Sequence, residues 1–165
     1  MVEVEELNSA EIEELLKSIG YGHLACSHND IPYVVPVHFA FDDGVIFIYT
    51  TEGKKSVIIH ENPNVCLEAE MVVDNQNWQS VIVNGVAERL RDETERQHAL
   101  ELITKANPTL SPAVSIRWLD NWVRENIEVV YRITPERTSG RRARAETTDP
   151  ANVVSGADRS KTSVQ

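Results

Sequence analysis

The stretch IPYVVPVHFAFDDGVIFIYTTEGKKSVIIHEN, residues 31–62, carries more structural information than any other part of the chain. Its first third is rich in β-branched and aromatic residues, which favour a half-buried strand. Asp42-Asp43-Gly44 then provides a hairpin turn, because Gly44 can adopt a positive φ without steric cost. A second strand over residues 45–50 follows, and a helix is expected to begin after Gly53.

The expected helix opens with Lys54 and Lys55, so its positive dipole end and two ammonium groups converge on one place. This combination suits a phosphate group. Thr50, Thr51 and Ser56 can add hydrogen bonds to the same group. The alternative is a solvated lysine pair, in which each like charge opposes the helix dipole by about 0.3–1 kcal/mol. A bound anion reverses the sign of that cost, which favours the phosphate interpretation.

The pattern P-Y-V-V-P-V-x-F-x-F-D-D-G-V-I-x-x-Y-T-x-x-G-K-K resembles the flavin-binding core of the pyridoxamine 5'-phosphate oxidase-like split-barrel flavoproteins. Within that family it is most similar to the FMN-binding branch that includes nitroimidazole reductases. A second matching segment, WQSVIVNGVA, follows at residues 78–87, and the resemblance extends over about residues 8–141. It implies a split β-barrel that binds FMN and forms a homodimer, in which two barrels close two flavin sites across a shared interface.

The resemblance also implies which residues contact the flavin. Val35, Pro36, Val37 and His38 would lie along the ring, with backbone groups bonding its polar edge, Val37 packing on its face and His38 a candidate for proton transfer. The alternative for this segment is an ordinary central strand with a buried histidine. From the second segment, Ser80 and Val81 would approach the flavin beside the helix that carries Lys55, while Trp78 would cover the ring or pack in the core.

The chain departs from some relatives at its C-terminal end, where TSGRRAR spans residues 138–144 and no histidine follows His98. Pyridoxamine-phosphate oxidases end in an Arg-x-His segment, and haem-degrading relatives use a C-terminal histidine as the iron ligand. Both activities are therefore disfavoured, whereas a deazaflavin-dependent activity stays open. The remaining histidines lack metal-ligand spacing, so no metal site is expected.

Composition limits the other possibilities. A chain of 165 residues is long enough for one domain. Its formal net charge of −10 argues against a nucleic-acid partner or an anionic membrane surface. The acidic N-terminus lacks the basic region of a signal peptide, so we expect a cytoplasmic protein without membrane attachment. Cys26 and Cys66 are expected to be inert buried thiols.

Hydrophobic periodicity predicts a mainly β fold with flanking helices (α+β), a six-stranded antiparallel split barrel over residues 1–145, and a disordered tail over residues 146–165. Gly85 marks a bulge within the fifth strand, unless Asn84-Gly85 forms a hairpin that splits this strand in two. The expected strands are residues 21–27, 31–41, 45–50, 65–72, 79–90 and 128–133, and the expected helices are residues 8–20, 54–61, 92–105 and 113–124.

Two functions fit these features. The first is an FMN-dependent oxidoreductase that reduces a small electron-poor compound, such as a nitro compound or a quinone, with NAD(P)H. The second is a flavin-binding protein or sensor without turnover. The sequence does not separate them, because no residue in it is required to act as an acid or a base.

Overall fold

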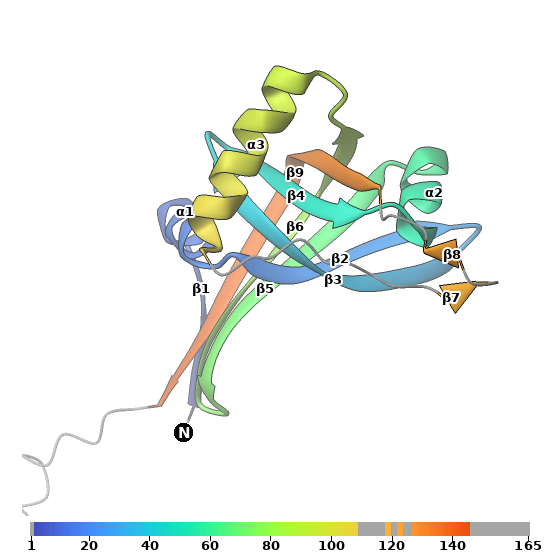
Figure 1. The fold of residues 1–165 in the computed structure, drawn as a ribbon. Coiled ribbons are helices and arrows are strands. Elements are labelled where there is room, and N and C mark those ends of the chain that lie inside the picture. Colours follow the sequence, from blue (N-terminus) through green and yellow to red (C-terminus); the bar gives the residue numbers. More distant parts are fainter. Residues whose placement is uncertain (1, 109–117, 120–121, 124–126, 146–165) are drawn as a thin grey trace, which may run out of the picture.

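The computed structural model describes residues 2–108, 118–119, 122–123 and 127–145. Its main sheet has seven antiparallel strands in the order β1-β9-β4-β3-β2-β5-β6, and an additional pairing between β6 and β9 closes all strands except β1 into a barrel (Figure 1). This confirms the predicted six-stranded barrel with flanking helices. The barrel strands are β2 (Tyr21–His28), β3 (Ile31–Asp42), β4 (Val45–Thr51), β5 (Asn64–Asp74), β6 (Asn77–Arg89) and β9 (Glu128–Ala145).

The seventh strand, β1 (Val2–Glu6), was not predicted, and β9 continues to Ala145 although its end was expected at Ile133. The extension of β9 pairs with β6 as far as Ala143. β1 pairs with the last residues of β9, which places Glu3 opposite Arg144 and Glu5 opposite Arg142. Opposite charges on facing strands favour this pairing although few large apolar residues take part. Together with the turn between β5 and β6, these segments form an arm that extends from the barrel (Figure 1).

Three helices flank the barrel: α1 (Ser9–Ser18), α2 (Lys54–Glu61) and α3 (Glu93–Ala106). Helix α1 begins with a capping box, in which Asn8 Oδ1 accepts from the Glu11 N–H at 3.0 Å and the Glu11 carboxylate accepts from the Asn8 N–H at 2.9 Å. Asp92 caps α3, accepting from the Glu95 N–H at 3.0 Å. Each cap satisfies N–H groups that the helix itself leaves unpaired.

Strand β6 is continuous, so the hairpin alternative at Asn84-Gly85 is wrong and the bulge prediction is confirmed. The register between β6 and β9 shifts between Asn84 and Gly85. A Cβ atom at Gly85 would lie 2.4 Å from the carbonyl oxygen of Thr134. Only glycine allows the two backbones to approach this closely.

The helix expected over residues 113–124 is wrong where the structure describes that segment. Trp118–Leu119 (β7) and Trp122–Val123 (β8) form a short antiparallel pair. Apolar residues three to four apart favoured the helix, but a short local pairing satisfies the same backbone groups. The rest of that segment, and the tail expected to be disordered over residues 146–165, lie outside the described residues.

Apolar side chains form two cores, one inside the barrel and one beneath α3. Inside, Phe39, Leu24 and Leu67 are fully buried, and Leu15 and Leu16 of α1 belong to the same cluster. On the outer face, Ala99 and Ile103 of α3 pack against residues of β3, β4 and β9. In the described part of the chain, no helix is long and apolar enough to span a membrane.

Candidate functional site

Strands β3 and β4 separate at one end of their pairing, next to α2. Their ladder runs from Asp42 opposite Val45 to His38 opposite Tyr49, and stops there. Beyond this point, residues 31–37 of β3 still pair with β2, while Thr50 and Thr51 pair with β9. Figure 1 shows the two strands diverging toward α2. Among the described residues, this edge of β3 therefore has no strand partner, and its backbone polar groups are available to a ligand.

Helix α2 begins at this gap, directly after β4. Gly53 precedes the helix, and its N–H donates to the hydroxyl of Ser56 at 3.3 Å. Ser56 is 7% exposed, so this hydrogen bond is part of a buried first turn of the helix. The N–H groups of a first helical turn lack intrahelical acceptors, and they can hold an anion.

The two lysines at the start of α2 lie near one pair of facing residues in the sheet, Cys26 and Tyr33. Lys55 is half-buried, and its ammonium group donates to the carbonyl oxygen of Thr51 at 2.7 Å. Its pKa is lowered because burial disfavours the charged form, an effect that the nearby thiol of Cys26 partly opposes. The ammonium group of Lys54 lies 4.8 Å from the centre of the Tyr33 ring. Tyr33 and Cys26 face each other in the β2–β3 ladder, so both charges gather at one end of the gap.

Strand alternation divides the predicted ring-binding residues between two faces. Val37 is 3% exposed and belongs to the barrel core, and Val35 packs against the same core. The side chain of Val37 is therefore committed to the interior, which is a correction to its predicted packing on a flavin face. Pro36 and His38 point outward, as the alternation requires.

His38 belongs to an outward-facing group that the sequence did not reveal. Its ring lies 5.5 Å from that of Tyr21, which in turn lies 5.8 Å from the ring of His23. His23 Nδ1 is 3.5 Å from a carboxylate oxygen of Glu68. Burial raises the pKa of Glu68, with a smaller contribution from Glu70, while His23 lowers it. The signal that could have identified this group is the register of β3, β2 and β5, which no local motif encodes.

Tyr49 lies opposite His38 in the β3–β4 ladder, and its side chain forms a second polar contact near the gap. Its hydroxyl donates to the carboxylate of Glu128 at the start of β9. Burial, together with that carboxylate, raises the pKa of Tyr49 to about 12. The phenol therefore stays protonated at neutral pH and acts as a hydrogen-bond donor.

Trp78, Ser80 and Val81 do not meet Lys55 within one chain. On the arm, Ser80 lies opposite Glu70 of β5 and Arg141 of β9. Glu70 is five residues along β5 from Val65, and Val65 pairs with Cys26, which lies near Lys55. At a rise of about 3.3 Å per residue, that separation is roughly 16 Å. Val81 is 1% exposed and belongs to the barrel core. Trp78 lines a small cleft of the arm.

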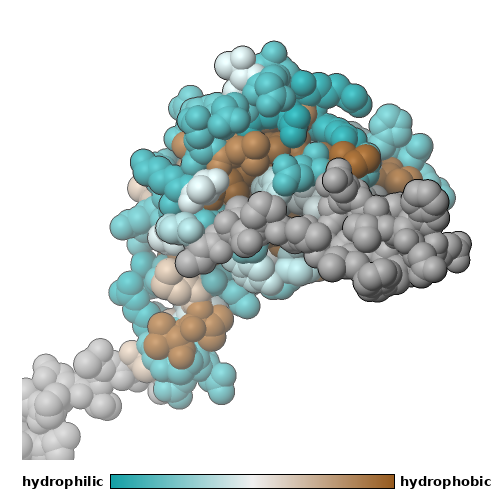
Figure 2. Space-filling model, in the orientation of Figure 1, coloured by the Kyte–Doolittle hydropathy of each residue, from teal (hydrophilic) through white to brown (hydrophobic). Residues whose placement is uncertain are grey.

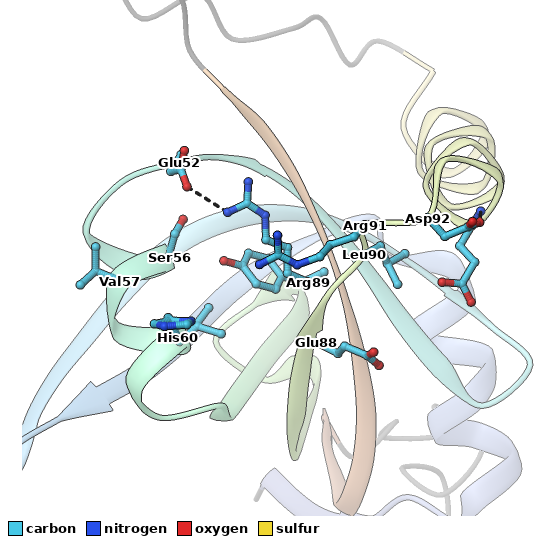
Figure 3. Close-up of a pocket in the computed structure, with 12 residues that line it drawn as sticks. Glu52, Ser56, Val57, His60, Glu88, Arg89, Leu90, Arg91 and Asp92 are labelled. Atoms are coloured by element: carbon cyan, nitrogen blue, oxygen red, sulfur yellow. Dashed lines mark hydrogen bonds and ion pairs between the residues drawn. The ribbon is translucent and has the colours of Figure 1, made fainter.

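The cysteines form no disulfide, and burial raises the pKa of both thiols. Within the described ranges, no three His, Cys, Asp or Glu side chains are grouped to hold a metal ion. A cavity of about 690 Å³ lies on the other side of α2, and of the predicted site residues only Ser56 lines it (Figure 3).

Comparison with known proteins places these features in a family. The structure resembles that of an FAD-binding protein from Mesorhizobium loti, with 28% sequence identity and a TM-score of 0.70 over 88% of this chain and 100% of that one. An FAD-binding protein from Mycobacterium smegmatis shares 27% identity with a TM-score of 0.61, over 84% of this chain and 98% of that one. A candidate 5-nitroimidazole antibiotic resistance protein from Bacteroides thetaiotaomicron has the same fold, with 19% identity and a TM-score of 0.65, over 87% of this chain and 89% of that one.

The sequence model described as pyridoxamine 5'-phosphate oxidase matches residues 8–142, which include β2 to β6, most of β9, both lysines of α2 and the gap between β3 and β4. This match confirms the resemblance seen in the sequence, and the chain belongs to the pyridoxamine 5'-phosphate oxidase family of split-barrel flavoproteins.

Proposed function

We propose that the protein binds a flavin as FMN, with the phosphate held by the first turn of α2 and the ring held by residues of the gap between β3 and β4. The observation that carries this proposal is the half-buried ammonium group of Lys55 at the end of that gap. Burial disfavours its charge, and a phosphate dianion beside it would compensate. The FAD-binding proteins among its structural relatives support a flavin as the ligand.

The donor set fits a phosphate. Lys55, Lys54 and the N–H groups of the first turn are all donors or cations, and no acidic residue stands in that turn. Thr50 and Thr51 add hydroxyl groups at the end of β4. For the ring, the unpaired edge of β3 offers the carbonyl oxygen of Pro36, which has no N–H, while the hairpin register directs the backbone groups of Val35 to β2. His38 lies where the gap begins.

We infer that the protein is an oxidoreductase that reduces a small electron-poor compound, such as a nitro compound or a quinone, with NAD(P)H. A bound flavin supplies the two-electron chemistry. Such a reduction also needs a proton, and His38 is the candidate donor, because an imidazole side chain can act as a general acid and His38 lies where the gap begins. The nitroimidazole resistance protein supports only the fold, because its sequence is 19% identical to this chain.

The test is spectroscopic. The purified protein should carry flavin absorbance that bleaches with NADH or NADPH and recovers when a nitro compound or a quinone is added. Flavin absorbance that neither nucleotide bleaches would assign the protein to the non-catalytic binding proteins. A deazaflavin spectrum, or no bound chromophore after incubation with FMN, would contradict the proposed cofactor.

We also propose a homodimer, because Trp78 and Ser80 lie on the arm, away from Lys55 of the same chain. A second copy could bring its arm to the gap and complete the site. The exposed apolar side chains of the arm, Val4, Met71, Val72, Val73 and Ile82, are 41–78% exposed and offer an interface. Figure 2 shows an apolar patch on the arm. Light scattering that gives a monomer with flavin fully bound would contradict this arrangement.

A further inference from the structure

The largest cavity described above lies beside the proposed phosphate site without including its lysines. Its volume is about 690 Å³, within the usual range of about 300–1,000 Å³ for ligand pockets. It is formed by α2 with the preceding Glu52, by the end of β6 and the residues up to the first turn of α3, and by Tyr131 of β9 (Figure 3). The cavity contains Glu52 and Ser56, which are sequence neighbours of Thr51 and Lys55, so it begins where the proposed phosphate site ends.

The acidic side chains around this cavity already have partners. Glu88 and Glu95 accept from Arg132 at 2.8 and 3.4 Å. Asp92 caps α3 through its side chain. Their charges are thus partly compensated before any ligand binds.

Two arginines point into the centre of the cavity (Figure 3). Arg89 donates to Glu52 at 2.9 Å, an ion pair that crosses one side of the cavity. Arg91 makes no ion pair with any residue that the structure describes, although it lines the same space. His60 and the hydroxyl of Ser56 face it from α2. The available cationic group is therefore Arg91, and Arg89 can exchange Glu52 for another anion.

The rest of the wall is apolar. Leu90, Ile59 and Tyr131 are 3–4% exposed and form the buried lining. Val57 of α2 lines the edge of the cavity, and its apolar side chain is 65% exposed. A flat apolar group would bury Val57, while an attached anion would reach the arginines. That pairing of an aromatic ring and a phosphate is the chemistry of a nucleotide.

We propose that this cavity binds the adenylate part of a dinucleotide, with its phosphate at Arg91 and Arg89 and its base against Val57. The proposal rests on the proposed flavin site, because the cavity adjoins the α2 turn assigned to the flavin phosphate. Two dinucleotides carry this group: FAD, whose FMN part would occupy the gap, and NAD(P)H, the proposed reductant. The shared chemistry is the adenosine phosphate.

The experiment uses ADP as the probe and isothermal titration calorimetry on the full chain. Arg91→Ala should weaken ADP binding about ten- to a hundredfold, the loss of one or two charge-assisted hydrogen bonds. Glu52→Gln should strengthen it, because Arg89 is released from its ion pair. Arg137→Ala is the matched control, since Arg137 is an exposed arginine of β9 opposite Asn84, outside the cavity. Thermal unfolding of each variant monitors the fold.

The source of the adenylate follows from two further titrations. If Arg91→Ala weakens FAD but leaves FMN unchanged, the group belongs to the flavin; if it weakens NADPH instead, the group belongs to the reductant. ADP that does not bind, or that binds equally to Arg91→Ala and the unmutated protein, overturns the proposal. Either result would leave the flavin site standing if FMN still binds and depends on Lys55, so the two failures are distinguishable.

Discussion

The ammonium nitrogen of Lys55 lies 2.7 Å from the carbonyl oxygen of Thr51, so the last residue of β4 holds the lysine that begins the proposed phosphate site. This contact fixes the charge at the end of the gap before any ligand arrives. Binding then requires little additional ordering of a long, flexible side chain, which lowers its entropic cost.

Lys55→Ala should weaken FMN binding about ten- to a hundredfold, because a charge-assisted hydrogen bond contributes roughly 1.5–3 kcal/mol. Riboflavin lacks the phosphate and should bind the unmutated protein more weakly than FMN does. In the variant this preference should shrink. Fluorescence titration of both ligands against both proteins measures the coupling, and an unchanged FMN-to-riboflavin ratio would show that Lys55 is only a surface charge.

The lowered pKa of Lys55 predicts a pH dependence of FMN binding. A bound phosphate favours the ammonium form, so binding raises this pKa and takes up protons where free Lys55 is deprotonated. FMN affinity should therefore fall as the pH rises through the lowered pKa of the free protein. The dependence should be weaker in Lys55→Met, which keeps the length of the side chain. Equal slopes in the two proteins would assign the proton uptake to another group.

The raised pKa of Glu68 predicts a second pH dependence, in the stability of the protein. Because the folded state binds the proton more tightly than the unfolded chain does, the contribution of Glu68 to stability is largest at low pH. It is lost as the pH rises from the ordinary glutamate range through the raised pKa. Denaturant unfolding across that range should show this loss, and Glu68→Gln should remove it.

The close approach at Gly85 predicts that Gly85→Ala destabilises the barrel, since its Cβ would lie 2.4 Å from a backbone oxygen of Thr134. Overpacking of this kind costs about 1–3 kcal/mol. Gly53→Ala is the matched control, because a Cβ there meets no atom within 4 Å and the backbone φ of 173° is extended. Urea unfolding of both variants provides the comparison, and equal losses would contradict the steric explanation.

Local signals predicted most of the fold and half of the candidate site. The strand-turn-strand-helix over residues 31–62 follows from β-propensity, Gly44 and the lysine pair, all of which act between near neighbours in sequence. The gap between β3 and β4 was not predictable, because it depends on the point where the β3–β4 ladder ends while β4 continues to pair with β9 through Thr50 and Thr51. The group of Tyr21, His23, His38 and Glu68 depends on the register of three strands.

The end of β9 was missed because its buried positions hold small residues. Gly140 and Ala143 are buried, yet neither produces an apolar pattern. A Cβ at Gly140 would lie 2.9 Å from a side-chain carbon of Ile12, so the small residue is what admits α1. Hydrophobic periodicity detects large apolar side chains in the core. It does not detect glycine or alanine positions that are buried because side chains of other elements cover them.

Arg142 connects this part of β9 to both N-terminal elements, which leads to a prediction about the arm. Its guanidinium group forms an ion pair with Glu5 of β1 and donates to Glu11 of α1 at 2.7 Å, and its side chain is 16% exposed. Because the pair with Glu11 is partly buried, removing the arginine leaves carboxylates without their partner. Arg142→Ala should therefore destabilise the protein, and Arg137→Ala, at an exposed position of the same strand, should do so much less. Hydrogen exchange should show faster opening of β1 in Arg142→Ala, while the barrel strands keep their protection. Uniform loss of protection, or equal effects of the two variants, would show that β1 is not held by this arginine.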